Sequence, residues 1–426
     1  MSLIKKICLL TLFLCAVVVF TPMSALAQTK AVVENYLVDM PEVEDLKPET
    51  FEELSEVYEY KSEDDERMSF KMRYPKDWTV NEALIGTDFG SSKDIISEIV
   101  TFVSPPGPVG LPSLAARSRI FVEYSELSHQ ISSKNWVLKY MLSRGLTSEG
   151  MRVIDEKRTE FYYLEVEEDL TFGIHSVAQI NGNKVLLVRY RMPIDLSNLD
   201  EQGKSAGEID FIQDIRRKQS ENKPLQKASV DSFKILEPTD EYVESLLEYQ
   251  FLDLALVRYP RSWRQKAKPI RSIDRMEVGL FRINYDKKSK ARVLEGRIDV
   301  DMVNFSVVEA LDKENEILQR KMLGDRLILG EEANIPENII PDSLKEQSDF
   351  FENFTMKSYR AKNSEGRVLG YEFWVSKVLV GDYYFFFTML TPSQDDNFFS
   401  WSQNIETYKQ VLASFDPNLD NAFYDE

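Results

Sequence analysis

A six-residue motif occurs twice in this chain of 426 residues, and the distance between its copies is the strongest constraint on the fold. Arg-Tyr-Pro-x-x-Trp begins at Arg73 and again at Arg258, 185 residues later. A repeat of that length matches a whole domain, since domains commonly have about 100–200 residues. We interpret the proline as the end of a strand and the tryptophan as a cover over the sheet end. The motif residues are Tyr74, Pro75 and Trp78 in the first copy and Tyr259, Pro260 and Trp263 in the second.

Three further landmarks recur in the same order in both halves. They are an alternating segment typical of a half-buried strand, a glycine in a turn that needs positive φ, and a closing Ser-Phe pair. Four landmarks in one order predict two tandem copies of one domain, over residues 68–240 and 246–417. The recurring pairs are Arg119–Tyr124 with Arg297–Met302, Gly182 with Gly381, and Ser232-Phe233 with Ser414-Phe415.

Each copy has the same expected order of elements: alternating strands, a helix, more strands and a closing helix. The run Tyr383–Phe387 is apolar without alternation, which is typical of a central strand covered on both faces. Helices on both faces of a mostly antiparallel sheet would supply that cover. The predicted fold class is therefore α+β, with two tandem α-β-α sandwich domains. The main helices are expected at Ser132–Leu142, Val307–Met322 and Phe399–Ala413.

The first residues predict an export signal. Two lysines precede an apolar run at Ile7–Phe20, and Ala25-Leu26-Ala27 is a small-x-small cleavage site. We expect residues 1–27 to be removed, which places the chain in a bacterial periplasm or outside the cell, with no transmembrane segment after cleavage. Both cysteines, Cys8 and Cys15, lie in this segment, so the processed chain has no thiol or disulfide chemistry. The alternatives are an uncleaved anchor and lipid attachment at Cys15, although the run is shorter than the ~20 residues of a spanning helix.

Residues 28–67 are strongly acidic and precede the first copy of the repeat. Their glutamates alternate with a few apolar residues, which predicts a mobile, solvated leader that contains one short helix. A leader that binds a metal or a partner is the alternative. Residues 418–426 are expected to form a tail after the second copy.

The motifs resemble those of the PsbP-like domain, a family that includes the photosystem extrinsic protein P, Mog-type proteins and the DcrB lipoproteins. The resemblance rests on the Tyr-Pro-x-x-Trp group, the alternating meander, the glycine turn and the terminal helix that ends in Ser-Phe. It covers both copies and implies an α-β-α sandwich with an antiparallel sheet. It also implies a protein that binds or positions other proteins, because the family shares no catalytic residues.

The charge balance and the scarcity of metal ligands exclude several classes of protein. The formal net charge of −19 argues against a nucleic-acid partner, because phosphate binding needs a basic face. Two histidines, and no cysteine after cleavage, leave too few ligands for a zinc, haem or iron–sulfur site. No metal and no cofactor is therefore expected.

No catalytic residue is predicted either. The chain lacks the Gly-x-Ser-x-Gly and His-Glu-x-x-His motifs of common hydrolases. His129 and His175 could be imagined in a Ser-His-Asp site, but a single histidine at a strand end is more often a satisfied or surface side chain. The densest acidic group, which we interpret as the solvated edge of a sheet, comprises Glu165, Glu167, Glu168 and Asp169.

One proline-rich loop in the first copy is the best candidate for a partner-binding site. Prolines make a segment stiff and apolar, so a partner can dock on it at low entropic cost. The alternative is a rigid crossover between two strands. The second copy has a charged loop at 285–294 instead, so the copies are not interchangeable. The candidate residues are Pro105, Pro106, Pro108, Val109, Leu111 and Pro112.

The function expected from the sequence is that of a non-enzymatic exported protein that binds or assembles with another envelope protein. The first alternative is a protein that binds a small molecule or a divalent cation between its domains, near Glu237–Glu248, which the acidic excess motivates. The second alternative is a hydrolase that depends on a histidine.

Overall fold

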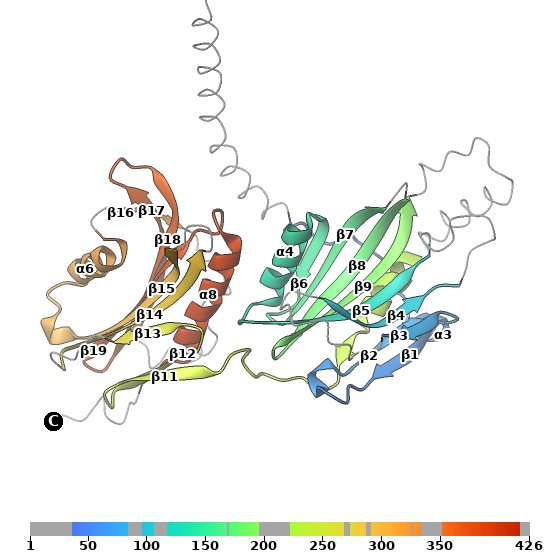
Figure 1. Cartoon of the computed structure of the whole chain (residues 1–426), viewed down its shortest axis with the longest axis horizontal. Coiled ribbons are helices and arrows are strands. Elements are labelled where there is room, and N and C mark those ends of the chain that lie inside the picture. The colour runs from blue at the N-terminus through green and yellow to red at the C-terminus, as the bar shows by residue number, and fades with distance from the viewer. Residues whose placement is uncertain are drawn as a thin grey trace, which may run out of the picture. The chain divides into compact units, whose positions relative to one another are not determined.

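The computed structural model of the chain describes residues 36–83, 96–105, 117–167, 170–195, 222–267, 273–286, 291–324, 327–333 and 352–417. The chain divides between Val243 and Glu244 into two compact units. Figure 1 shows the first unit in blue to green and the second in yellow to red. Among the described residues, no helix is both long and apolar enough to cross a bilayer.

The first unit contains a seven-stranded sheet and a three-stranded sheet, and all their strand pairs are antiparallel. The spatial order of the large sheet is β3 (Thr79–Glu82), β4 (Ser97–Val103), β5 (Arg119–Glu126), β9 (Lys184–Asp195), β8 (Leu170–Asn181), β7 (Arg158–Glu167) and β6 (Thr147–Val153). The small sheet is β1 (Ser55–Tyr60), β2 (Phe70–Pro75) and β10 (Lys234–Ile235).

The second unit repeats this arrangement strand for strand. Its large sheet is β13 (Arg264–Ala267), β14 (Arg275–Asp286), β15 (Ala291–Asn304), β19 (Tyr383–Pro392), β18 (Val368–Val380), β17 (Glu352–Asn363) and β16 (Leu327–Ala333). Its small sheet is β11 (Leu246–Phe251), β12 (Ala255–Pro260) and β20 (Asp416–Pro417). The fold class predicted from the sequence, α+β with antiparallel sheets in two sandwich-like halves, is confirmed.

Helices lie against the large sheets, and short ones join the strands. The first unit has α3 (Pro48–Leu54), the 3-10 turn η1 (Glu66–Met68), α4 (Ser133–Arg144) and a closing helix at 222–231. The second unit has the 3-10 turn η2 (Phe305–Val307), α6 (Leu311–Leu323) and α8 (Phe398–Ala413). The helix expected from Val307 begins only at Leu311, because the Asn304 side chain accepts a 2.9 Å bond from the Ser306 amide and holds η2 as a separate turn.

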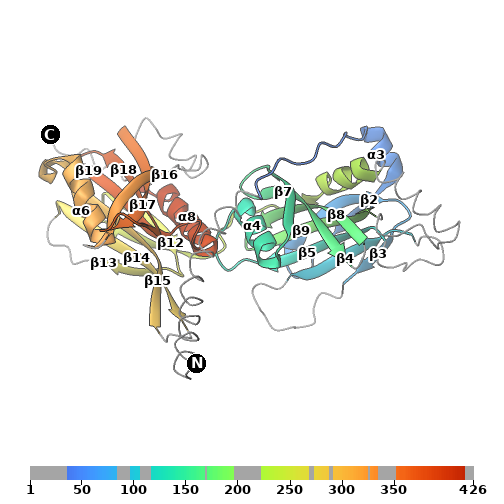
Figure 2. The same ribbon diagram turned by 90° about the horizontal axis from the view of Figure 1, so that it is seen from above.

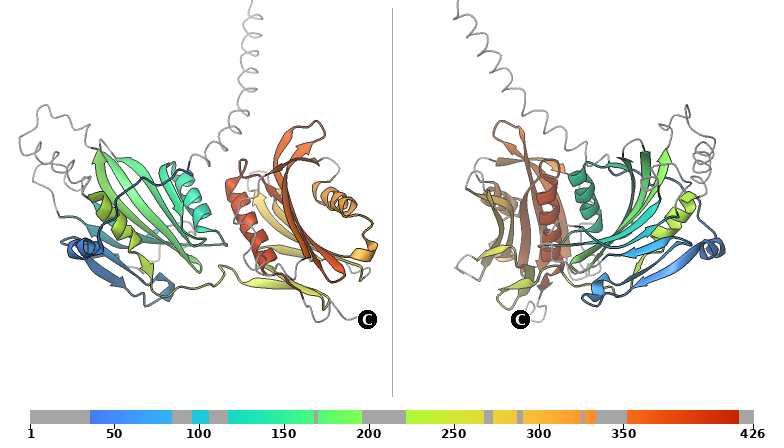
Figure 3. Two further views of the ribbon diagram at one scale, coloured as in Figure 1. Left: turned by 180° about the vertical axis from the view of Figure 1, so that it is seen from behind. Right: turned by 45° about the vertical axis from the view of Figure 1, so that its right-hand side comes forward.

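The central strand of the second unit is covered on both faces, as its apolar run predicts. Strand β19 is fourth of the seven strands. Phe386 packs with Leu318 of α6, while the carbonyl oxygen of the next residue, Phe387, accepts a 2.8 Å bond from the Tyr408 hydroxyl of α8. Figure 3 shows α6 and α8 on opposite faces of the sheet.

The core of the first unit lies between its two sheets and the closing helix. The small sheet contributes Phe70 and Met72, and the segment after the closing helix contributes Phe233. They pack on the inner face of β4, β5, β8 and β9, where Phe102 and Val188 are fully buried.

The structure differs from the predicted mobile leader. Tyr36 donates a 2.7 Å bond from its hydroxyl to the Leu146 carbonyl, and the Met151 amide of β6 donates to the Val38 carbonyl at 2.7 Å. Figure 2 shows this stretch as the dark-blue trace that runs from beside β7 to α3. The short helix is present as α3, but strand β1 follows it and pairs with β2 along six residues. The first unit therefore begins before residue 68.

We expect Phe387→Ala to lower the free energy of unfolding by about 3–5 kcal/mol. The reason is that removal of the buried ring leaves a cavity beside a strand that is covered on both faces. Urea unfolding followed by tryptophan fluorescence measures the change. Phe399→Ala is the matched control, because Phe399 lies on α8 with 45% of its surface exposed. The control should cost about 1 kcal/mol or less, and equal losses in both variants would contradict this account of the core.

Candidate functional site

The turn between β8 and β9 and the segments that contact it form the hairpin end of the first unit. Gly182 is at the tip with φ +59°, a conformation that other residues rarely adopt. A Cβ at Gly182 would also lie 3.1 Å from Thr239 Cγ2 and 3.2 Å from Arg67 Cδ. Gly182 is therefore needed both for the turn and for the close approach of the chain that follows β10.

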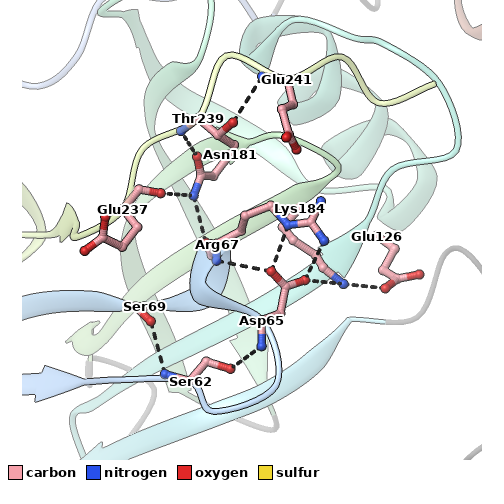
Figure 4. Close-up of polar contacts among 10 residues, drawn as sticks. All are labelled: Ser62, Asp65, Arg67, Ser69, Glu126, Asn181, Lys184, Glu237, Thr239 and Glu241. Carbon is pink, nitrogen blue, oxygen red and sulfur yellow. Dashed lines mark hydrogen bonds and ion pairs between the residues drawn. The ribbon is translucent and has the colours of Figure 1, made fainter. Parts of the chain in front are cut away.

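Asn181 holds that chain in place, as Figure 4 shows. Its Nδ2 donates to the carbonyl oxygens of Arg67 and Glu237, both at 2.9 Å, and its Oδ1 accepts from the Thr239 amide at 2.8 Å. The side chain is 1% exposed, so these three bonds replace the water it loses on folding. Asn181 thus binds residues 237–239, the start of the segment that leads to the second unit, to the first unit.

The hairpin end of the first unit is rich in basic side chains. Arg67 makes a two-pronged ion pair with Asp65, with nitrogen–oxygen distances of 2.8 and 2.9 Å. Lys184 lies 3.5 Å from the same carboxylate and also pairs with Glu126. The hydrogen bond to Asp65 raises the pKa of Arg67 against the opposite effect of burial, and the charge of Glu241 adds to the rise.

Lys157 extends this cationic group to the segment that leads to the second unit. Its Nζ donates to the Thr239 carbonyl at 2.9 Å and pairs with Asp240. Acidic residues of that segment therefore lie against basic residues of the first unit.

The second unit has the same backbone arrangement but different side chains. The Phe305 amide donates to the Asp382 carbonyl at 2.8 Å, as the Leu127 amide does to the Asn183 carbonyl at 2.8 Å in the first unit. The Asn304 amide donates to the Asp274 carbonyl at 2.8 Å, which brings the segment at Ile273 beside η2. The exposed fractions are 62% for Ile273, 50% for Phe305 and 51% for Val307. We call these three residues the apolar hairpin end.

Sequence reasoning missed the apolar hairpin end. It assigned Val307 to a helix, and it treated the two turns as equivalent because each contains a glycine. One signal was present: alignment of Arg119 with Arg297 puts Phe305 opposite Leu127 and Val307 opposite His129.

The proline-rich candidate loop lies almost wholly outside the described residues. Pro105 is exposed just after β4, whereas Pro106, Pro108, Val109, Leu111 and Pro112 are not described. The charged loop expected at 285–294 in the second unit is instead occupied in large part by β14 and β15, which pair Tyr285 with Arg292 and Asp286 with Ala291.

The repeated Tyr-Pro-x-x-Trp residues are placed at the end of the core in both units. Trp78 packs edge-on against Tyr190 with ring centroids 5.4 Å apart, and Trp263 is 2% exposed. The Tyr74 hydroxyl donates to Glu56 at 3.2 Å, and the Tyr259 hydroxyl donates to Gln265 at 2.6 Å. Pro75 and Pro260 are the last residues of β2 and β12.

His175 is buried in an ionic cluster rather than exposed at a site. Its Nε2 lies 2.6 Å from Glu160 Oε1, and Arg152 Nε donates to the other oxygen of Glu160 at 2.8 Å. Burial alone would raise the pKa of Glu160, but His175 and Arg152 lower it to about 2. His129 lies at the surface, with Nδ1 3.0 Å from the Ser128 hydroxyl. The two histidines therefore belong to different environments.

Four of the acidic residues considered for catalysis or cation binding contact basic or hydroxyl groups in the described part of the chain. Glu165 and Glu167 both pair with Arg191, while Glu168 and Asp169 lie outside the described residues. In the segment proposed for a cation, Glu248 accepts from Arg258 at 2.8 Å, and Glu244 accepts from the Ser262 hydroxyl at 3.0 Å. In the described ranges, no group of three or more His, Cys, Asp or Glu is arranged to hold a metal ion.

The second unit contains a buried carboxylate cluster beneath α6. Lys321 Nζ lies 2.8 Å from Asp301, 2.7 Å from Glu277 and 3.2 Å from Asp299. Burial raises the pKa of Asp301 to about 6, although Lys321 opposes the shift. Such a carboxyl group could act as an acid or base, but Asp301 is 2% exposed, so no substrate reaches it.

We expect Asn181→Ala to release the segment that follows β10 and to lower the free energy of unfolding by about 1–3 kcal/mol, because three buried bonds are lost. Amide hydrogen exchange at residues 236–243 should rise. Asn183→Ala is the matched control, since Asn183 Oδ1 has no hydrogen-bond partner among the described residues. Unchanged protection in Asn181→Ala would contradict the assigned role.

The raised pKa of Asp301 predicts a pH dependence of stability with a defined sign. Between about pH 4 and pH 6 the unfolded chain loses this proton while the folded chain keeps it, so the contribution to stability falls as the pH rises. In Asp301→Asn this slope should vanish. Urea unfolding measured at several pH values across that range tests the prediction. Asp382→Asn, which changes an exposed turn residue, is the control. If the free energy of unfolding of Asp301→Asn fell with pH as steeply as that of the wild type, the prediction would be wrong.

No protein-family model and no curated protein sequence matches the chain. Among solved structures, the chain is similar to a cyanobacterial PsbP from Synechocystis sp., with 13% identity, 43% of this chain and 93% of that chain covered, and a TM-score of 0.27. It is also similar to the type VI secretion immunity protein TplEi from Pseudomonas aeruginosa, with 10% identity, 82% and 95% covered, and a TM-score of 0.19. A third match is a chain of the Tle4–Tli4 complex, with 8% identity, 82% and 95% covered, and a TM-score of 0.19. At these TM-scores none of the three carries an argument, so the function proposed below rests on the residues of this chain.

Proposed function

We propose that the chain is a non-enzymatic exported protein that binds another protein of the cell envelope. We further propose that its two units are tandem copies of one PsbP-like domain. The support for a duplication is the shared strand order of the two large sheets together with the repeated Tyr-Pro-x-x-Trp motif. The support for export is the predicted signal at residues 1–27.

The observation that carries the binding function is the difference between the two hairpin ends. Equivalent backbone bonds hold both ends, yet the first is polar and occupied by the chain's own segment, whereas the second exposes Phe305 and Val307. Neighbouring exposed apolar side chains are typical of a surface that a partner covers. Large apolar side chains at such a surface also contribute most of the binding energy at protein interfaces.

The chemistry of the ionisable groups supports binding over catalysis. Catalytic acids and bases need both a tuned pKa and access to substrate. The two strongly perturbed carboxyl groups, Glu160 and Asp301, are each 2% exposed and are paired with His175 and Lys321. Glu160 and His175 join the neighbouring strands β7 and β8, and Asp301 joins β15 to Lys321 of α6, so both groups have a structural use.

The binding function predicts a stoichiometric complex. The processed chain should capture one envelope protein after cross-linking in intact cells, and the two purified proteins should then form a complex of defined stoichiometry. Sedimentation at micromolar concentrations measures that complex. Capture without reconstitution, or no capture above the level of an unrelated exported protein, would count against the proposal.

A further inference from the structure

The two hairpin ends differ in charge as well as in polarity. In the first unit, Lys157 and Arg67 face a segment that carries Asp240 and Glu241. In the second unit, the connection between β11 and β12 has three residues, 252–254, against nine, 61–69, between β1 and β2, so this connection has no counterpart of Arg67.

An exposed acidic residue lies beside the apolar hairpin end. Asp382 is exposed at the tip of the β18–β19 turn, and its carbonyl accepts from the Phe305 amide. Ile273 lies beside η2, because the carbonyl of the next residue, Asp274, accepts from the Asn304 amide. The second unit therefore presents apolar side chains with the exposed acidic residue Asp382 next to them.

The first unit shows what kind of chain fits this place in the fold. Residues 237–239 lie there in a line of backbone contacts to Asn181 and Lys157, and their neighbours carry charges opposite to those of the surface. The same complementarity applied to the second unit requires apolar side chains for Phe305 and Val307, and positive charge for Asp382.

We propose that the apolar hairpin end of the second unit is the docking site for an extended segment of a partner protein, with apolar side chains flanked by Lys or Arg. This inference rests on the proposed function, because it requires that a partner exists. It adds the position of the site and the chemistry of the segment that the site selects.

Residues 418–426 of the chain itself have the wrong charge for this site. They follow β20 as residues 236–243 follow β10, but they carry Asp420, Asp425 and Glu426 and no basic residue. Like charges across an interface are unfavourable, so Asp382 disfavours this segment and favours a basic one.

Fluorescence anisotropy with labelled peptides tests the inference on the processed full chain. The first probe is a nine-residue peptide of alternating apolar and polar residues with two lysines at each end. The second has glutamates in place of the lysines, and the third has the sequence of residues 418–426. We expect the lysine peptide to bind at least tenfold more tightly than either other probe, with an affinity that falls as salt rises from about 50 to about 500 mM.

Variants locate the binding on the surface. Phe305→Asp and Val307→Asp should each weaken binding of the lysine peptide at least tenfold. Phe399→Asp, which alters a phenylalanine of similar exposure on α8, should leave binding within about twofold of wild type. Asp382→Lys should reduce the preference for lysine over glutamate peptides. Circular dichroism confirms that each variant is folded.

Several outcomes would overturn the inference. They are no binding of the lysine peptide, equal binding by Phe305→Asp, tighter binding of the 418–426 peptide, or a dimer of the chain that Phe305→Asp abolishes. Capture of the envelope partner by Phe305→Asp as efficiently as by wild type would overturn the site but leave the proposed function standing. Absence of any partner for the wild-type chain would instead overturn the proposed function.

Discussion

The middle strand of each large sheet has to be covered on both faces, and the rest of the architecture follows from that constraint. Strand β9 buries four consecutive residues, Val185–Val188, and β19 buries Phe385–Phe387. Consecutive side chains of a strand point to opposite faces, so such a run exposes apolar surface unless both faces are covered. In the second unit α6 and α8 provide that cover, and each helix uses one apolar side to do so.

Two acidic residues in the described part of these covered layers lie beside a basic partner, which reduces the cost of removing their charge from water. Glu123 of β5 pairs with Arg189 at 2.7 and 2.8 Å, and the equivalent residue of the second unit, Asp301, pairs with Lys321. The position keeps an acidic residue in both units while the basic partner comes from a strand in one and a helix in the other. An unpaired charge at either position would be strongly destabilising.

Local patterns in the sequence were sufficient for the sheets, the turns and most helix positions. The unbroken apolar run at Tyr383–Phe387 identified the central strand, and Gly182 and Gly381 identified turns that need positive φ. The leader was misjudged because the two glutamates of Ser55–Tyr60, three residues apart, fit an exposed helix as well as an edge strand. Only the register with β2 decides between them, and that pairing is a tertiary contact.

The candidate site depends still more on tertiary contacts. Nothing in the local sequence says that Asn181 contacts Thr239, or that Phe305 stays exposed after η2. Comparison of the two units at equivalent positions carries that information, because the shared strand order makes the differing side chains stand out. The proline-rich loop was predicted as a binding site from its composition alone, and most of it lies outside the described residues.

The closing strands β10 and β20 bear on how the chain folds as it emerges. Each small sheet pairs a strand near the start of its unit with one at the end, so β2 must wait for β10 and β12 must wait for β20. Contacts between distant residues form slowly, because the loop between them must be closed first. The first unit can nevertheless be complete before β11 is needed, since β10 ends at Ile235 and β11 begins at Leu246. Two units of one topology can therefore fold one after the other as the chain emerges, which limits the time in which a strand of one unit could pair with the other.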